Sequence, residues 1–239
     1  MVGACVLGVC DAPSPPRCGS ELLAGWVARP SCGAAFVDRA FSSTDVSTTL
    51  SACTGAIDLR STDSNAELRL PAVTGACPSS RPFTVTMVGR LPTSYQRGLG
   101  FTLNWTSGEF ITLNRWVWNS DRESATDVLV SQSGGAFLEP QSRNVDTGGT
   151  SRPDRPWGWY IGNDGGWWTM TVTVNPAADT VTATYAQPSL SSIIYTASYS
   201  MRVPDGVLPS VRVLTAGPCD GSGLRSELLS LTTDAPLWR

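Results

Sequence analysis

Two residue types are missing from this sequence. It has no histidine and no lysine, so all 17 of its basic residues are arginine. Without histidine there is no Ser-His-Asp triad, no Cys-His pair and no imidazole ligand for a metal. Without lysine there is no amine to form a Schiff base and no ammonium group to hold a phosphate. These two absences exclude most of the common catalytic arrangements.

Charge is also scarce, because charged residues make up 15% of the chain against about 25% in an average soluble domain. The formal net charge is −3 and the arginines are scattered, so the sequence offers no basic surface to nucleic acid. No run approaches the roughly 20 apolar residues that span a bilayer, and the first residues lack the positive start of a signal peptide. We expect neither nucleic-acid binding nor membrane insertion.

Glutamate is rare, and no two of the six glutamates stand two residues apart on a candidate strand. That spacing is the simplest way to aim two carboxylates into one cleft, and glycosidases need such a pair about 5–9 Å apart. We therefore predict that the protein is not an enzyme and assign no catalytic residue. A polysaccharide hydrolase or lyase remains an alternative.

Cysteine is unevenly placed. Six of the seven cysteines lie in the first third of the chain, namely Cys5, Cys10, Cys18, Cys32, Cys53 and Cys77, and the seventh is Cys219. The odd number leaves at least one without a partner in the chain. The first four could also bind zinc, but they include no C-x-x-C pair, so disulfides in an oxidising environment are favoured and no metal site is assigned. Buried free thiols are the third interpretation.

Residues 1–20 are rich in cysteine and proline and are predicted to form an irregular arm, whereas residues 21–239 are predicted to form one β-sandwich domain. Beyond the arm, short runs with alternating apolar and polar residues recur between turn residues. The predicted strands cover residues 34–41, 55–61, 66–73, 83–91, 98–105, 109–118, 126–132, 158–162, 192–203, 210–217 and 225–233, together with a hairpin at 166–187. The best helical candidate is a turn or two near Glu21–Val27. Many short strands without a repeat predict an all-β fold of two stacked antiparallel sheets.

The hairpin is the clearest of these elements, with the sequence GWWTMTVTVNPAADTVTATYAQ over residues 166–187. Trp168 begins a series of alternate apolar residues and is predicted to lie in the core. Trp167 is predicted to lie on the opposite face, which is lined with threonine. In the turn, Asn175 and Asp179 are expected to accept hydrogen bonds from nearby amides.

Three stretches carry a resemblance to a known superfamily. PFTVTMVGRLPTSYQRGLGFTLN (82–104) is similar to an early strand pair, GGWWTMTVTVNPAADTVTATYAQ (165–187) to a central hairpin led by aromatic residues, and SVRVLTAGPCDGSGLRSELLSLTTDAP (210–236) to a closing pair. Together they resemble the concanavalin A-like lectin/glucanase (laminin-G-like) jelly-roll superfamily over roughly residues 50–239. The resemblance implies an antiparallel two-sheet β-sandwich, and it implies that Cys77 and Cys219 could meet in a disulfide.

The sequence departs from the enzymes of that superfamily. The E-x-D-x-(x)-E strand of its retaining glucanases has no match. The stretch RSELL at 225–229 matches four residues of a strand motif in jelly-roll alginate lyases, but the accompanying Gln-x-His strand is impossible without histidine. We therefore interpret Arg225 and Glu227 as outward-facing strand charges.

Members of the superfamily often bind Ca²⁺ at the rim of the sandwich. The candidate ligands here are Asp121, Asp146 and Asp164, but no D-x-D-x-D loop is present. We predict no cofactor, with Ca²⁺ as the one possibility.

Tryptophan is abundant, and seven of the nine fall into two groups: Trp105, Trp116 and Trp118, then Trp157, Trp159, Trp167 and Trp168. Flat indole rings pack against the C–H faces of sugars, and nearby polar side chains bind the hydroxyl groups. The predicted glycan platform therefore consists of Trp116, Trp118, Trp157, Trp159 and Trp167 with Asp121, Asp154, Asn163 and Asp164. The alternative is that most of these indoles fill the interior of the sandwich.

These observations predict a non-catalytic, surface-exposed binding or adhesion module for a glycan or another cell-surface polymer. The Ser/Thr-rich composition and the cysteines, without an export signal, favour an extracellular or virion-surface location, for example in a phage tail or as a capsid accessory protein. The alternative is a purely structural assembly subunit of a virion or extracellular particle. In that case the N-terminal arm and the tail at 234–239 would contact neighbouring subunits.

Overall fold

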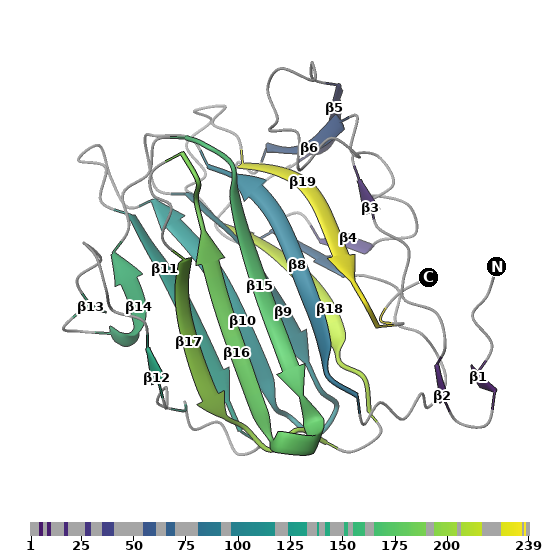
Figure 1. The fold of residues 1–239 in the computed structure, drawn as a ribbon. Helices are drawn as coiled ribbons and strands as arrows, with labels where there is room; N and C mark the ends of the chain where they lie inside the picture. Colours follow the sequence, from purple (N-terminus) through teal and green to yellow (C-terminus); the bar gives the residue numbers. More distant parts are fainter. Residues whose placement is uncertain are drawn as a thin grey trace.

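Two antiparallel sheets stack face to face in the computed structural model and form a β-sandwich (Figure 1). Backbone and side chains are described for residues 81–91, 98–115, 126, 130–132, 138, 165–189, 195–204, 207–214, 226–235 and 237. Backbone strands alone are described at 5–6, 9–10, 17–18, 27–29, 35–40, 55–60, 66–69, 97, 116–117, 124–125, 127–129, 142–143, 151–152, 155–160, 194 and 215–216. No helix in these parts of the chain is long and apolar enough to cross a membrane.

The sheet nearer the viewer in Figure 1, here called the front sheet, has the strand order β12-β17-β16-β15-β8-β19-β6-β5, and β3 also pairs with β19. Its strands are β12 (Ser142–Arg143), β17 (Ile194–Ser200), β16 (Thr180–Ala186), β15 (Trp168–Asn175), β8 (Phe83–Arg90), β19 (Ser226–Thr233), β6 (Gly55–Arg60), β5 (Ala35–Ala40) and β3 (Arg17–Cys18). In this sheet β8 lies between β15 and β19, the last strand of the chain, so strands that are far apart in the sequence are neighbours.

The second sheet, the back sheet, has the strand order β13-β14-β11-β10-β9-β18-β7-β4. Its strands are β13 (Ser151–Arg152), β14 (Arg155–Tyr160), β11 (Ser124–Ser131), β10 (Phe110–Val117), β9 (Arg97–Asn104), β18 (Ser210–Ala216), β7 (Ala66–Arg69) and β4 (Val27–Arg29). A separate two-stranded sheet contains β1 (Cys5–Val6) and β2 (Val9–Cys10), and the 3-10 helix η4 (Pro176–Ala178) joins β15 to β16.

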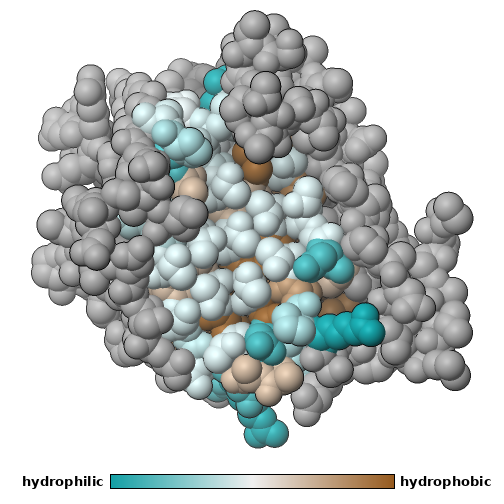
Figure 2. Space-filling model, in the orientation of Figure 1, coloured by the Kyte–Doolittle hydropathy of each residue, from teal (hydrophilic) through white to brown (hydrophobic). Residues whose placement is uncertain are grey.

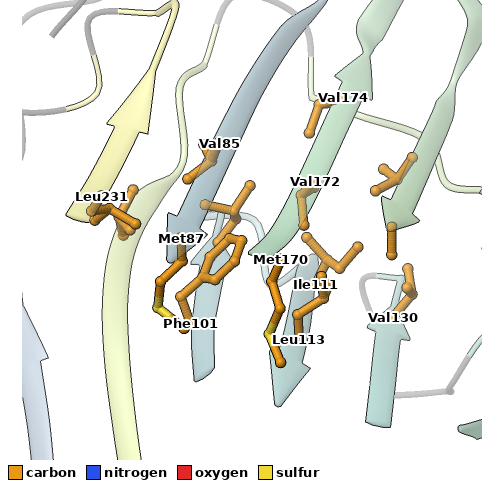
Figure 3. Close-up of a cluster of buried hydrophobic side chains, with 14 of the residues drawn as sticks. Val85, Met87, Phe101, Ile111, Leu113, Val130, Met170, Val172, Val174 and Leu231 are labelled. Atoms are coloured by element: carbon orange, nitrogen blue, oxygen red, sulfur yellow. The ribbon is translucent and has the colours of Figure 1, made fainter. Parts of the chain in front are cut away.

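The core lies between the two sheets and is formed by every second residue of the central strands. Along β15 the burial alternates strictly, with Trp168, Met170 and Val172 buried and the threonines between them half-buried. Figure 3 shows Met170 and Val172 facing side chains of the back sheet, such as Phe101 and Leu113. Alternation with a period of two residues is what a strand with one buried face requires. The predicted two-sheet β-sandwich is therefore confirmed.

Every predicted strand overlaps an observed one, although β14 begins three residues before the prediction at 158–162 and the short strands β1, β2, β3, β4, β12 and β13 were not predicted. The predicted hairpin at 166–187 contains β15, η4 and β16, and the structure places Trp168 in the core with none of its surface exposed. The candidate helix near Glu21–Val27 lies outside the described residues except at Val27, where β4 begins. Within the predicted N-terminal arm, β3 pairs with β19 and so extends the front sheet.

The turn between β15 and β16 differs from the expectation. Asn175 makes no side-chain hydrogen bond to the following amides. The side chain of Asp179 accepts a hydrogen bond from the backbone N–H of Val203, 24 residues away, at 3.0 Å. The prediction of local bonds from both side chains was wrong, because the short 3-10 helix closes the turn with the backbone bond from Asp179 N–H to the Pro176 carbonyl at 3.3 Å.

The segment that leads from β17 in the front sheet to β18 in the back sheet is held by hydrogen bonds from three other parts of the chain. Besides its contact with Val203, Asp179 accepts the N–H of Met201 at its carbonyl, at 2.9 Å. The amide of Gln132 bonds both backbone groups of Arg202, at 2.8 and 3.1 Å. The indole N–H of Trp105 donates to the carbonyl of Val207 at 3.0 Å. Such bonds satisfy backbone groups where the chain leaves a sheet.

Replacing Asp179 with alanine is expected to lower the free energy of unfolding by about 1–3 kcal/mol, because the amide of Val203 loses its acceptor. Residue 179 also has φ +48°, a left-handed conformation that asparagine and aspartate adopt more easily than alanine. Asp179→Asn keeps an oxygen acceptor in the same place and should lose much less stability. Urea denaturation followed by tryptophan fluorescence measures both, and equal stability of the alanine variant and the wild type would contradict the proposed anchor.

Candidate functional site

The outward face of the front sheet carries an unusual concentration of hydroxyl groups, which we call the hydroxyl face. It consists of Thr84, Thr86, Thr169, Thr171, Thr173, Thr180, Thr182, Thr184, Thr196, Ser198 and Thr232, all of them half-buried. In Figure 2, which has the orientation of Figure 1, the centre of the visible face is near-white, the colour of residues with intermediate hydropathy. Solvent-facing strand positions usually carry a mixture of polar and charged residues, so a face made of threonine and serine is a specific feature of this protein.

The register of the strands aligns these side chains into rows. One row crosses five adjacent strands and contains Thr232, Thr86, Thr171, Thr184 and Thr196 as successive paired residues. A second row, two residues further along the strands, contains Thr84, Thr173, Thr182 and Ser198. In such a sheet, neighbours within a row are about 4.8 Å apart and rows about 6.7 Å apart. The hydroxyl face is thus a regular two-dimensional array.

Hydrogen bonds within the rows hold some of these hydroxyl groups in place. Thr86 and Thr171 are 3.2 Å apart between their Oγ1 atoms, and Thr182 Oγ1 lies 3.0 Å from Ser198 Oγ. Thr84 and Thr173 make a longer contact of 3.5 Å. Threonine is also stiff about χ1 because it is branched at Cβ. Each hydroxyl has one donor and two acceptor positions, so a paired hydroxyl can still bind a ligand.

One end of the same outward face carries a charged and aromatic group, the arginine cluster, formed by Arg90, Glu227 and Trp167. Arg90 is the last residue of β8 and pairs in register with Glu227 on β19. Its Nε atom donates a hydrogen bond to Glu227 Oε2 within an ion pair. The guanidinium carbon also lies 4.7 Å from the centre of the Trp167 ring, a cation–π distance.

Glu227 does share the outward side of the sheet with Arg90, but it is not a solvent-exposed charge. Its side chain is 6% exposed and the Arg90 side chain 28%. The sequence interpretation of an outward-facing strand charge agrees with the side on which Glu227 lies, and the burial of its side chain is an additional finding. Arg225, which shared that interpretation, lies outside the described residues. A carboxylate buried to this extent requires a paired cation or several donors, and Arg90 supplies the cation.

The predicted tryptophan platform is only partly described. Trp167 is described and lies in the arginine cluster. Trp116 is a backbone position in β10, and Trp157 and Trp159 are backbone positions in β14, without described side chains. Trp118, Asp121, Asp154, Asn163 and Asp164 lie outside the described residues.

The backbone register separates two parts of that platform. Trp116 pairs with Ala125 on β11, whereas Trp159 pairs with Thr126, the next residue of the same strand. Register positions one residue apart belong to alternate faces of a regular sheet. The structure therefore does not bring the backbone positions of Trp116 and Trp159 to one face, and a single platform that includes both stays a prediction.

The two remaining tryptophans of the group belong to the fold. Trp105 and Trp168 are both buried, with 4% and 0% of their surface exposed. For these two residues the alternative interpretation is correct, because their indole rings fill the interior of the sandwich. The other tryptophans of the group, apart from Trp167, have no described side chains.

Two further predictions fall outside the described part of the chain. Cys77 and Cys219, the candidate disulfide, lie there, and so do the candidate Ca²⁺ ligands Asp121, Asp146 and Asp164. Among the described residues no group of three or more acidic or cysteine side chains could hold a metal ion. Neither the disulfide nor the Ca²⁺ possibility is tested by these residues.

Sequence reasoning assigned threonines to the face opposite Trp168 but gave them no function. The signal was present in the alternation of TVT at 84–86, TMTVT at 169–173 and TVTAT at 180–184. What the sequence did not reveal is that these runs lie side by side in register.

Three solved structures are similar to this one. A legume lectin-like domain from Entamoeba histolytica is 6% identical, with a TM-score of 0.53 over 90% of this chain and 92% of that one. The metal-free carbohydrate recognition domain of Emp46p is 10% identical, with a TM-score of 0.48 over 90% of each chain. The CBM2 module of the evolved Dit of Lactobacillus casei BL23 phage J-1 is 12% identical, with a TM-score of 0.47 over 73% of this chain and 71% of that one.

No family model matches the sequence, and no curated protein matches it. The similarity to the Entamoeba histolytica domain establishes that the chain has the lectin-like, concanavalin A-like β-sandwich fold, as the sequence resemblance implied. At this level of identity the comparison concerns the fold alone.

Proposed function

We propose that the protein is a non-catalytic, surface-exposed binding module whose hydroxyl face holds a glycan or another cell-surface polymer. The observation that carries this proposal is the alignment of threonine and serine side chains in rows across five strands. A threonine side chain presents a hydroxyl and a methyl group side by side. A sugar presents hydroxyl groups and C–H groups in the same way, so the two surfaces are chemically complementary.

The rigidity of the face favours binding. The hydroxyl groups sit on paired strands, and contacts such as Thr86–Thr171 and Thr182–Ser198 restrict their side chains before any ligand arrives. A surface that is already ordered loses little conformational entropy when it binds. An extended array of weak, similar contacts suits a polymer with repeating units, since each unit meets an equivalent set of groups.

The composition of the face argues for a glycan over a protein partner. The cores of protein–protein interfaces are enriched in aromatic residues, methionine and arginine and are depleted in serine. The hydroxyl face as defined contains none of the enriched types, since it consists of threonines and one serine. A structural subunit that makes its contacts through the terminal segments remains the second candidate, but this face does not favour it.

The proposal leaves out catalysis because the carboxylates described near this face are already engaged. Glu227 is paired with Arg90, and Asp234 Oδ1 accepts the backbone N–H of Thr84 at 2.6 Å. The rows themselves carry no carboxylate, whereas polysaccharide hydrolysis needs two that face the scissile bond. No cofactor is part of the proposal.

The proposed location is outside the cell or on the surface of a virion, for example in a phage tail or as a capsid accessory protein. The low share of charged residues and the serine- and threonine-rich composition support this location. The description of the Entamoeba histolytica structure as legume lectin-like supports the glycan as ligand.

The test is binding to a glycan array and to cell-wall polysaccharides, with Thr171→Val and Thr184→Val combined. Valine keeps the shape of threonine and suits a strand, so only the hydroxyl groups are lost. We expect binding to weaken about tenfold or more, since each lost hydrogen bond contributes about 0.5–1.5 kcal/mol. Thr112→Val is the matched control, because Thr112 forms a similar hydroxyl pair with Thr102, at 2.8 Å, on the back sheet.

Equal binding by the double variant and the wild type would contradict the role of the hydroxyl face. Trp116→Ala and Trp157→Ala test the predicted tryptophan platform in the same assay, and unchanged binding by both would remove that platform. Release of new sugar ends from any bound polymer would overturn the non-catalytic assignment.

A further inference from the structure

The longest line of hydroxyl groups on the front sheet runs across the strands. We call it the five-strand row, and it consists of Thr232, Thr86, Thr171, Thr184 and Thr196, which are successive paired residues on β19, β8, β15, β16 and β17. All five side chains are half-buried, so each keeps part of its surface exposed. The row spans four inter-strand spacings, about 19 Å in all.

Lines of hydroxyl groups along the strands are shorter. On β8 the outward position after Thr86 is Val88, which is 4% exposed, and on β16 the outward position after Thr184 is Ala186. Successive outward positions on one strand are also about 6.7 Å apart, against about 4.8 Å between strands. The closest regular spacing of hydroxyl groups is therefore across the sheet.

The hydrogen bonds between these hydroxyl groups run in the same direction. The contacts Thr86–Thr171, at 3.2 Å, and Thr182–Ser198, at 3.0 Å, each join two neighbouring strands within one row. A hydroxyl group has one donor and two acceptor positions, so each member of such a pair keeps at least one acceptor position for a ligand. A ligand that follows a row meets these groups in equal steps.

The twist of a β-sheet also favours a ligand that crosses the strands. Neighbouring strands are rotated relative to each other by roughly 20–25°. A line across the middle of the strands is the axis of this rotation and stays straight, whereas the strand direction changes from each strand to the next. The five-strand row passes through the middle of β8 and β15. A straight molecule therefore contacts all five strands only when it lies across them.

We propose that the five-strand row binds a linear, extended polysaccharide that lies across the strands, with one sugar ring over each strand. This proposal rests on the function proposed above and names its ligand class. In a pyranose chain linked equatorially through positions 1 and 4, each ring advances the chain by close to one inter-strand spacing. Successive rings consequently meet equivalent threonines. A chain that coils into a helix, such as an α-1,4-linked glucan, does not place its rings along a straight line.

The first test measures how affinity depends on the length of the ligand. Oligosaccharides of β-1,4-linked glucose, mannose and N-acetylglucosamine are titrated in order of increasing length by isothermal titration calorimetry. In the series that binds, affinity should rise about two- to tenfold with each added ring. It should level off when five rings cover the five strands of the row. The matched series of α-1,4-linked glucose should bind more weakly at every length.

The second test measures the direction of the ligand with two double variants that share one substitution. Thr171→Val/Thr184→Val removes two hydroxyl groups of the five-strand row and should weaken binding about tenfold or more. Thr171→Val/Thr173→Val removes two hydroxyl groups of β15, of which only one belongs to the row, so binding should weaken only about threefold. A larger loss in the second variant would mean that the ligand follows the strand, and it would overturn the proposal.

The outcomes separate this proposal from the one on which it rests. If Thr171→Val/Thr184→Val weakens binding but affinity does not level off at five rings, or the α-1,4-linked series binds as well, the arrangement across the strands is wrong and the binding face stands. If neither double variant changes binding, or no polysaccharide binds, the proposed function itself fails. Circular dichroism establishes that each variant is folded, and the length series on the wild type decides the question if one is not.

Discussion

Replacing Gly100 with alanine is expected to lower the free energy of unfolding by about 3 kcal/mol or more, at the upper end of what overpacking costs. Gly100 lies in β9, between β10 and β18 of the back sheet. A Cβ atom at this position would overlap the carbonyl oxygen of Leu113 and stand 2.7 Å from the Cα atom of Asn114. Both are backbone atoms of the neighbouring strand, so relief requires β9 and β10 to move apart.

Thr102→Ala is the matched control for this prediction. Thr102 lies on the same strand two residues along, and its substitution removes atoms instead of adding them. It loses the hydroxyl pair with Thr112 and should cost about 0.5–1.5 kcal/mol. Urea denaturation measures both variants. An alanine at position 100 that costs no more than the control would contradict the close approach of the two strands. Binding by any folded fraction should be unchanged, since the hydroxyl face belongs to the other sheet.

The fold could be predicted because its main signal is local. The hairpin at 166–187 illustrates this, since alternate apolar residues, a proline-containing turn and a second alternating run stand within one short stretch. The buried face of β15 follows directly from that pattern, with Trp168 inside and threonines outside. A period of two residues fixes which side of a strand is buried whatever its neighbours are.

The candidate site could not be predicted because it depends on pairing between distant strands. Thr86 and Thr232 are neighbours in one row although 146 positions separate them in the sequence. No local sequence pattern indicates that β8 lies between β15 and β19. From the sequence alone, the threonines were therefore interpreted only as ordinary outward positions. The burial of Glu227 has the same origin, because its partner Arg90 becomes adjacent only through this pairing.

Arg115 is a further residue that local reasoning could not place. Its position on β10 has the inward parity of Ile111 and Leu113, and the structure buries it completely. The guanidinium carbon lies 5.2 Å from the centre of the Tyr185 ring of the front sheet, and Nη1 reaches Thr126 Oγ1 at 3.5 Å. Alternation predicts an apolar residue there. A buried arginine is compatible with the fold only because side chains of other strands contact it.

The adjacent residues Trp167 and Trp168 are expected to give opposite results when each is replaced by alanine. Trp168→Ala should lower the free energy of unfolding by about 3–5 kcal/mol, the usual cost of deleting a buried tryptophan. Its ring is fully buried, lies 6.3 Å from the Tyr185 ring between centres, and occupies the space that a side chain at Gly89 would need. Trp168→Phe retains most of this packing and should cost clearly less.

Trp167→Ala should cost less stability than Trp168→Ala, about 1–3 kcal/mol, because its outward ring keeps part of its surface exposed and loses only part of the buried area of a core tryptophan, together with a cation–π contact. Its effect should appear in binding, since Trp167 belongs to the predicted tryptophan platform and lies at one end of the outward face of the front sheet. Urea denaturation and polysaccharide binding, measured on both variants, distinguish the two roles. A Trp167 variant as unstable as the Trp168 variant, with binding unchanged in its folded fraction, would make both tryptophans structural and would remove the aromatic support from the arginine cluster.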